Sequence, residues 1–167
     1  MPDRVLRLTT FEELAGIEEN LHLALGVFDG VHVGHRAVIG RALEAARRSG
    51  GLAGVVTFDP HPIRVLAPSR APSSLLATLD HKAHLLEELG VGLMLAITFD
   101  EAFANLDAET FVDRLCLSGV KTLAVGEDWK FGRGRRGDVA MLRKAAIERG
   151  FTLEAVPPVM ADGERIS

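Results

Sequence analysis

The sequence alternates short apolar segments with amphipathic segments of helical length, and this order predicts an α/β fold for the 167-residue chain. The apolar segments are bounded by turn residues and carry few polar side chains, as expected for parallel strands that are buried on both faces. Strand–helix–strand units of this size form right-handed crossovers on a parallel sheet. We therefore predict a Rossmann-like, doubly wound parallel sheet of about five strands with helices on both faces.

Five strands and four helices are predicted. The strands are Leu21–Val27, Leu52–Phe58, Leu93–Phe99, Thr122–Gly126 and Thr152–Val156, and the last has the weakest strand pattern. The helices are Val38–Arg48, His81–Leu89, Ala108–Leu117 and Val139–Arg149. Asp107 and Asp138 precede the last two helices and are candidate N-caps. Gly50, Gly90 and Gly150 follow three of the helices and predict where they end.

Two connections between the predicted elements are longer than usual. One runs from Asp59 to about Thr78 and contains several prolines, and the other runs from Glu127 to Gly137. Both follow the carboxyl end of a strand, the edge at which open parallel sheets bind ligands. If the strands take the usual order 3-2-1-4-5, the first and fourth are neighbours. The loops Phe28–His35 and Glu127–Gly137 would then flank one crevice.

The composition is that of an ordinary soluble protein, with 47% hydrophobic and 25% charged residues. A net charge of −4 argues against a general nucleic-acid binder. The single cysteine, Cys116, cannot form an internal disulfide and is interpreted as a packing residue. The N-terminus lacks the apolar core of a signal peptide, and no apolar run approaches the roughly 20 residues that span a bilayer. We expect one domain over residues 1–167, cytoplasmic, with neither membrane nor nucleic-acid partner.

The first strand runs into a motif, Gly26-Val27-Phe28-Asp29-Gly30-Val31-His32-Val33-Gly34-His35. Gly30 and Gly34 remove side chains where a backbone turns tightly or a ligand approaches. His32 and His35 share one face if they lie in a first helical turn, beside free N–H groups at the positive end of the helix dipole. A polyphosphate is the natural occupant. Two imidazoles that hydrogen-bond its α-phosphate would stabilise the charge that develops as pyrophosphate leaves. The motif therefore indicates nucleotidyl transfer from ATP.

Other interpretations of this motif stay open. A His-x-x-His pair can bind a metal, but one carboxylate and no further nearby histidine give weak support for a zinc site. The two histidines can also be incidental residues at a helix start. Asp29 could orient a neighbour, hold substrate or help to recruit Mg²⁺.

A second glycine-rich segment, Gly132–Gly137, satisfies the pattern G-x-G-x-x-G. A dinucleotide fingerprint follows directly on a strand, whereas this segment begins about six residues after Gly126, and arginines occupy its variable positions. We interpret it as a basic loop rather than a Rossmann cofactor site. Arg133 and Arg135 are its candidate phosphate contacts, and a solvated charge run is the alternative.

Several segments resemble one known family. His32-Val33-Gly34-His35 matches the His-x-Gly-His signature of the nucleotidylyltransferase superfamily. The longer stretch Gly26–His35 resembles the FMN adenylyltransferase domain of prokaryotic bifunctional riboflavin kinase/FAD synthetases. Three more segments are similar to landmarks of the same family, in the same order over almost the whole chain: Val56–Pro62, Asp107–Val112 and Val125–Gly132.

The resemblance implies that AMP is transferred from Mg²⁺-ATP to the phosphate of FMN, giving FAD and pyrophosphate. It makes His32 and His35 the catalytic residues, which contact the ATP phosphates and stabilise the transition state. The ATP pocket it implies is formed by Gly26, Phe28, Asp29, Gly30, Gly34 and Ser167. The FMN pocket it implies is formed by Pro60, His61, Pro62, Asp128, Trp129 and Phe131. An isoalloxazine ring needs apolar or aromatic walls. Only 5% of the chain is aromatic, so two aromatic residues in one loop, Trp129 and Phe131, are notable. No metal-binding residue is assigned.

The sequence departs from the family pattern at three places. Val27 stands where relatives usually carry Asn, and Leu66 stands where an aromatic residue is common. Ser167 is the first residue of a family motif, Ser-Ser-Thr-x-Ile-Arg, and we expect the riboflavin kinase domain to be absent from this chain. Two rivals therefore remain: a nucleotidylyltransferase with another phosphorylated acceptor, and a non-catalytic paralogue that binds flavin or nucleotide. Whether this form is active, its oligomeric state and its affinities are left open by the sequence.

Overall fold

The computed structural model describes residues 4–28, 33–59, 62, 66–67, 69, 78–161 and 164–166. Within them, six parallel strands form one sheet in the order β1-β4-β3-β2-β5-β6. The strands are β1 (Leu6–Leu8), β2 (Leu21–Leu25), β3 (Leu52–Asp59), β4 (Leu93–Thr98), β5 (Val120–Gly126) and β6 (Thr152–Val156). The helices are α1 (Phe11–Ala15), α2 (Val33–Ser49), α4 (Leu79–Leu89), α5 (Glu101–Ala104), α6 (Ala108–Leu115) and α7 (Val139–Arg149). An antiparallel pair, β7 (Val159–Ala161) and β8 (Glu164–Ile166), follows.

The predicted strand order is confirmed. The five expected strands are β2, β3, β4, β5 and β6, and they lie in the order 3-2-1-4-5 with β2 between β3 and β5. The expected strand number is too small by one, because β1 pairs with β4 at the edge of the sheet. A three-residue edge strand that exposes Leu6 and Arg7 has neither the length nor the apolar run of the buried strands.

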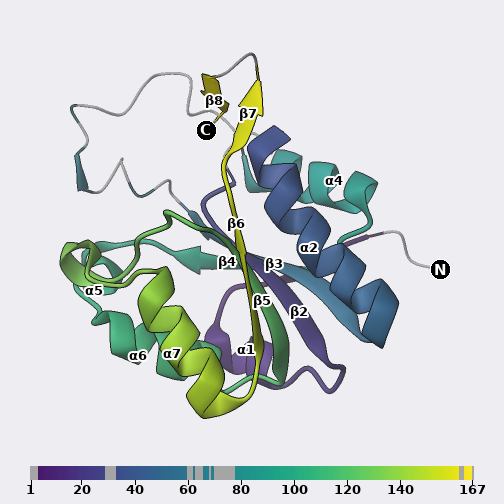
Figure 1. Ribbon diagram of the computed structural model, residues 1–167, viewed down its shortest axis with the longest axis horizontal. Helices are drawn as coiled ribbons and strands as arrows, with labels where there is room; N and C mark the ends of the chain where they lie inside the picture. The colour runs from purple at the N-terminus through teal and green to yellow at the C-terminus, as the bar shows by residue number, and fades with distance from the viewer. Residues whose placement is uncertain are drawn as a thin grey trace.

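The two faces of the sheet carry separate apolar layers. Leu23 and Leu95 belong to a cluster that includes residues of α1, α6 and α7. Ala24 and Met94, the next residues along the same strands, belong to the cluster with α2 and α4. This alternation is the strand period of two, and it places helices on both faces (Figure 1). The doubly wound prediction is confirmed.

Most helix ends match their sequence signals. Gly90 and Gly150 cap α4 and α7 in the left-handed conformation, with φ of 92° and 81°. Asp138 accepts a hydrogen bond from the backbone N–H of Met141 at 2.9 Å, so its predicted N-cap is confirmed. Asp107 occupies the corresponding position before α6 but accepts no cap hydrogen bond from the described residues of that helix. Its carboxylate pairs with Arg133 instead, at 3.2 Å.

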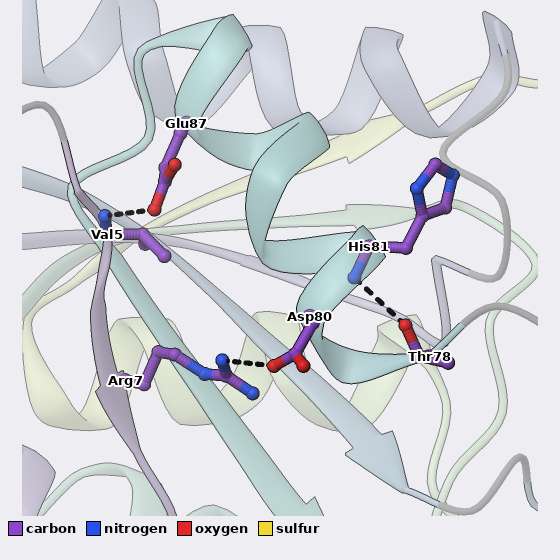
Figure 2. Close-up of polar contacts among 6 residues, drawn as sticks. All are labelled: Val5, Arg7, Thr78, Asp80, His81 and Glu87. Carbon is purple, nitrogen blue, oxygen red and sulfur yellow. Dashed lines mark hydrogen bonds and ion pairs between the residues drawn. The ribbon is translucent and has the colours of Figure 1, made fainter.

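Helix α4 is anchored to the edge of the sheet (Figure 2). Thr78 caps it by accepting from the backbone N–H of His81 at 3.0 Å. Asp80 forms an ion pair with Arg7 at 2.6 Å, and the Glu87 carboxylate accepts from the backbone N–H of Val5 at 3.0 Å. Contacts near both ends of the helix therefore hold α4 against the segment that contains β1.

His22 makes structural contacts, and Cys116 packs against the core as interpreted from the sequence. Nε2 of His22 lies 2.8 Å from the carbonyl oxygen of Gly50, and Nδ1 lies 2.9 Å from the hydroxyl of Thr122. Because a carbonyl oxygen only accepts, Nε2 donates and the buried ring ties β2, β5 and the end of α2 together. Cys116 is half-buried against the core, and this burial raises the pKa of its thiol. Across the described residues, no helix combines the length and apolarity that crossing a membrane demands.

We predict that Asp138→Ala lowers the free energy of unfolding by about 1 kcal/mol, because the first turn of α7 loses its capping acceptor. The measurement is urea denaturation monitored by circular dichroism. Asp138→Asn is the matched control, since its amide oxygen keeps the acceptor without the charge, and it should stay close to the parent. A loss as large in the Asn variant as in the Ala variant would show that the charge, and not the cap, is what matters.

Candidate active site

A cavity of about 530 Å³ with many aromatic side chains in its walls lies at the carboxyl ends of β2, β3, β4 and β5. Six of the nine Phe and Trp residues line it. The lining residues are Val27, Phe58, Pro62, Leu66, Ala67, Phe99, Phe103, Leu106, Phe111, Asp128, Trp129, Lys130, Phe131, Gly132 and Arg135. A cavity of this size with apolar walls and a few polar groups is the usual form of a small-molecule site.

Trp129 and Phe131 form one wall of the cavity. Their rings are stacked, with centroids 5.0 Å apart and an interplanar angle of 21°. Phe111 of α6 packs against both of them. Phe131 is buried, whereas Trp129 is only partly buried and keeps part of its ring accessible. Both residues therefore lie at the predicted flavin side, and Phe131 also anchors the loop in the core.

Backbone contacts hold this loop in shape. Phe131 and Gly137 exchange hydrogen bonds of 3.0 and 2.8 Å across it. Gly132 adopts a φ of 77°, and a Cβ atom there would come within 2.7 Å of the Cα of Ala108. Arg133 donates its backbone N–H to the carbonyl of Leu106 at 2.9 Å. The loop thus lies directly against the start of α6.

The two candidate arginines separate in the structure. Arg133 directs its guanidinium to Asp107, whereas Arg135 lines the cavity with Lys130 and Asp128. All three of these cavity-lining residues are exposed. Arg135 adopts a φ of 57°, a left-handed conformation that is unfavourable for a residue with a Cβ atom. The cavity therefore combines apolar walls with exposed charges, and Arg135, unlike Arg133, is a candidate arginine that lines it.

His35 belongs to α2, which packs on the other face of the sheet. α2 begins at Val33 and not at Val38 as predicted, so His35 stands in its first turn and Gly34 lies beside it. The ring of His35 meets Phe28 edge to face, with centroids 5.3 Å apart. Phe28 is buried at 2% exposure with a φ of 52°, and its ring folds back over Gly26. A Cβ atom at Gly26 would come within 2.9 Å of that ring. Gly26 and Phe28 therefore brace His35.

The two halves of the site meet at two consecutive residues. The side chain of Val27 lines the aromatic cavity, and Phe28 packs against His35 in the layer of α2. Asp128 to Gly132 line the same cavity as Val27. β2 and β5 are neighbours, as predicted, but the described residues of the loop Phe28–His35 do not line this cavity, so the single crevice between the two loops stays a prediction.

Some expected site residues are not placed by the structure. Asp29, Gly30, His32, Pro60, His61 and Ser167 lie outside the described residues. Pro62 lies in the cavity wall, as expected. The sequence analysis missed Phe99, Phe103 and Phe111, although Phe99 ends a predicted strand at the ligand-binding edge. Phe58 and Phe99 stand at the carboxyl ends of two predicted neighbouring strands, and this shared position is the signal that would have identified the aromatic wall.

The fold and the site define a class: a doubly wound α/β protein with a ligand cavity and a helix N-terminus at the point where the strand order reverses. The FAD synthetase family model matches residues 15–167. The chain therefore belongs to the FAD synthetase family.

Similar proteins agree with this assignment. The chain is 40% identical over 152 residues to the bifunctional riboflavin kinase/FMN adenylyltransferase of Escherichia coli K12, covering 90% of this chain and 48% of that protein. It thus spans about half the length of the curated relatives it matches. Among solved structures, one described as a macrolide-efflux protein from Streptococcus pneumoniae has a TM-score of 0.82 at 25% identity, covering 98% of this chain and 53% of the other. The pantoate-beta-alanine ligase of Francisella tularensis, with a TM-score of 0.63 and 13% identity over 98% of this chain and 71% of the other, shows the shared fold.

Gly132→Ala and Gly134→Ala form a matched pair that tests how the loop is held. Both glycines have positive φ, but an added Cβ at Gly134 meets only the side chain of Arg136, at 3.8 Å. We predict that Gly134→Ala costs about 1–2 kcal/mol from backbone strain alone. Gly132→Ala should cost more and change the emission of Trp129, the chain's only tryptophan, because the loop must move away from α6. Thermal denaturation and intrinsic fluorescence measure both, and equal effects would argue against the close contact.

Proposed function

We propose that this chain is an FMN adenylyltransferase, which transfers AMP from Mg²⁺-ATP to the phosphate of FMN and releases FAD and pyrophosphate. The observation that carries the proposal is the meeting, at Val27 and Phe28, of an aromatic cavity and a histidine-bearing helix N-terminus. An aromatic ring system and a polyphosphate are the ligands that these two environments favour. The family membership supports the same reaction.

The flavin ring would occupy the cavity. Trp129 offers a partly exposed ring face for stacking, and the buried Phe131 supports it from behind. Asp128 and Pro62 add a polar group and a rigid edge to the wall, and Pro60 and His61 would complete it. Arg135 would attract the phosphate of FMN toward the nucleotide side.

The ATP phosphates would lie at the start of α2. There the backbone N–H groups of the first turn, including that of Gly34, and the positive end of the helix dipole favour an anion. His35, held by Phe28, would donate to the α-phosphate together with His32. Gly26, Asp29, Gly30 and Ser167 would complete this pocket, and Mg²⁺ would enter as the complex with ATP.

The reaction needs no nucleophile from the protein. An oxygen of the ionised FMN phosphate attacks the α-phosphorus, and the bond from that phosphorus to the oxygen bridging to the β-phosphate breaks. Pyrophosphate carries away the bonding electrons, and the imidazoles stabilise the negative charge as it grows. The protein contributes positioning and charge stabilisation, which dominate reactions of this kind.

We predict that His35→Ala lowers kcat for FAD formation by roughly 10²–10³-fold, the usual cost of removing one donor from a developing oxyanion. FAD is separated by chromatography after incubation with FMN and Mg²⁺-ATP. His84→Ala is the control, because His84 is exposed on α4 and pairs with Glu88. Saturable FMN binding without turnover in the parent chain would favour the paralogue. Turnover only with another phosphorylated acceptor would replace FMN as the substrate.

We predict that Trp129→Ala weakens FMN binding about tenfold, since an aromatic pair contributes roughly 0.5–1.5 kcal/mol beyond the buried area. The KM for ATP should be unchanged, and Trp129→Phe should recover most of the affinity. Isothermal calorimetry gives the FMN affinity, and steady-state rates give the KM for ATP. A rise of the KM for ATP alone would place the nucleotide, and not the flavin, in this cavity.

A further inference from the structure

Lys82 is buried where helix α4 meets the carboxyl edge of the sheet, and its position is unusual for a lysine. It is 5% exposed and sits in the layer that contains Ala83 and Leu86. Burying an ammonium group costs several kcal/mol unless hydrogen bonds compensate it, and an apolar side chain would fill the same space more cheaply. The burial of this lysine therefore indicates that its ammonium group has a role that an apolar side chain could not perform.

Two of the contacts of Lys82 lead to one carbonyl. Its Nζ lies 3.0 Å from the carbonyl oxygen of Val27 and 3.2 Å from the hydroxyl oxygen of Thr57. The Thr57 hydroxyl lies 2.5 Å from the same carbonyl oxygen. The ammonium only donates and the carbonyl only accepts, so the hydroxyl accepts from Lys82 and donates to Val27. Both lone pairs of the Val27 carbonyl are thereby occupied.

The carbonyl that is held in this way lies between the two halves of the site. β2 ends at Leu25, so Val27 lies beyond the strand ladder that orients the preceding residues. The side chain of Val27 faces the aromatic cavity, and the next residue, Phe28, braces His35 from the opposite face of the sheet. Rotation of the Val27–Phe28 peptide would therefore shift the cavity wall relative to His35.

We propose that Lys82 and Thr57 are positioning residues that fix the acceptor cavity relative to the nucleotide site by clamping the Val27 carbonyl. This inference rests on the proposed adenylyl transfer. Helix α4, which carries Lys82, is itself held in place (Figure 2). Thr78 caps its first turn, and Asp80 and Glu87 bind the segment that contains β1. Each substrate binds mainly within its own half, so the clamp acts on the geometry between them.

The clamp predicts a loss in kcat rather than in binding. A misplacement of about 1 Å between reacting groups costs on the order of 10²-fold in rate. We predict that Lys82→Met and Thr57→Val each lower kcat roughly 10–100-fold, while the dissociation constants of FMN and of a non-hydrolysable ATP analogue change less than about threefold. Thr57→Ser keeps the hydroxyl and should retain the parent rate. The double variant should be little slower than the slower single variant, because both remove one shared device.

The controls separate a clamp from ordinary destabilisation. Thr10→Ala removes the cap of α1, where the Thr10 hydroxyl accepts from the backbone N–H of Glu13 at 3.1 Å, and should lower the melting temperature without loss of kcat. If Lys82→Met fails to fold, the pair Thr57→Val and Thr57→Ser decides alone. Parent-like kcat in the folded variants, or losses confined to one dissociation constant, would overturn the clamp. An inactive parent chain would instead count against the proposed function.

Discussion

The site exists where it does because β2 is enclosed on every side. β3 and β5 pair with its two edges, apolar layers cover its two faces, and all five of its residues are buried. The chain that leaves β2 must therefore turn out of the sheet, and it passes into α2 on one face. The chain that leaves β5 passes toward α7 on the other face. Two loops that diverge from adjacent strands leave the gap between them that becomes a ligand site.

The aromatic cavity is a second consequence of this arrangement. Six aromatic rings line a space of about 530 Å³ that is partly open to solvent, and contacts around it hold its shape. Ring packing alone would favour collapse. The described contacts that resist it are made by backbone: the hydrogen-bonded pair Phe131 and Gly137, and the close approach of Gly132 to the start of α6. A glycine at position 132 is thus a condition for the cavity and not a sign of flexibility.

The sequence predicted the parts of the fold that depend on periodicity and local chemistry. The strand order followed from buried apolar runs and the start of α7 from Asp138, whereas α2 begins at Val33 and not at the predicted Val38. It missed what depends on tertiary contacts. β1 is a short edge strand that is recognised only by its pairing with β4. Asp107 has the sequence position of an N-cap, but in the folded chain its carboxylate pairs with Arg133. The cavity wall draws rings from four separate segments.

Lys82 shows why such residues escape a reading of sequence alone. In a helix that begins near Thr78, a lysine among His81, His84 and Glu88 resembles a member of the solvated face. Its actual direction follows from where α4 sits against the sheet, and the sequence signals of that helix specify only its ends. The role of Thr57 could not be predicted either, because threonine is common inside strands whatever its contacts. The two acquire meaning only once β2, β3 and α4 are assembled.

The departures at Val27 and Leu66 can now be weighed against the geometry. The isopropyl group of Val27 continues the apolar wall, and its carbonyl rather than its side chain carries the polar contacts at this position. Leu66 is 61% exposed in the wall of the cavity, so it covers the ligand less completely than a ring would. Neither change touches the start of α2 or the contact between Phe28 and His35. The two departures thus affect the cavity wall and not the described start of α2, and the backbone of Val27 joins these two parts. Because transfer requires the two substrates to meet in one geometry, residues that join the two halves would act on kcat, whereas residues that line only the aromatic cavity would act mainly on the affinity for FMN.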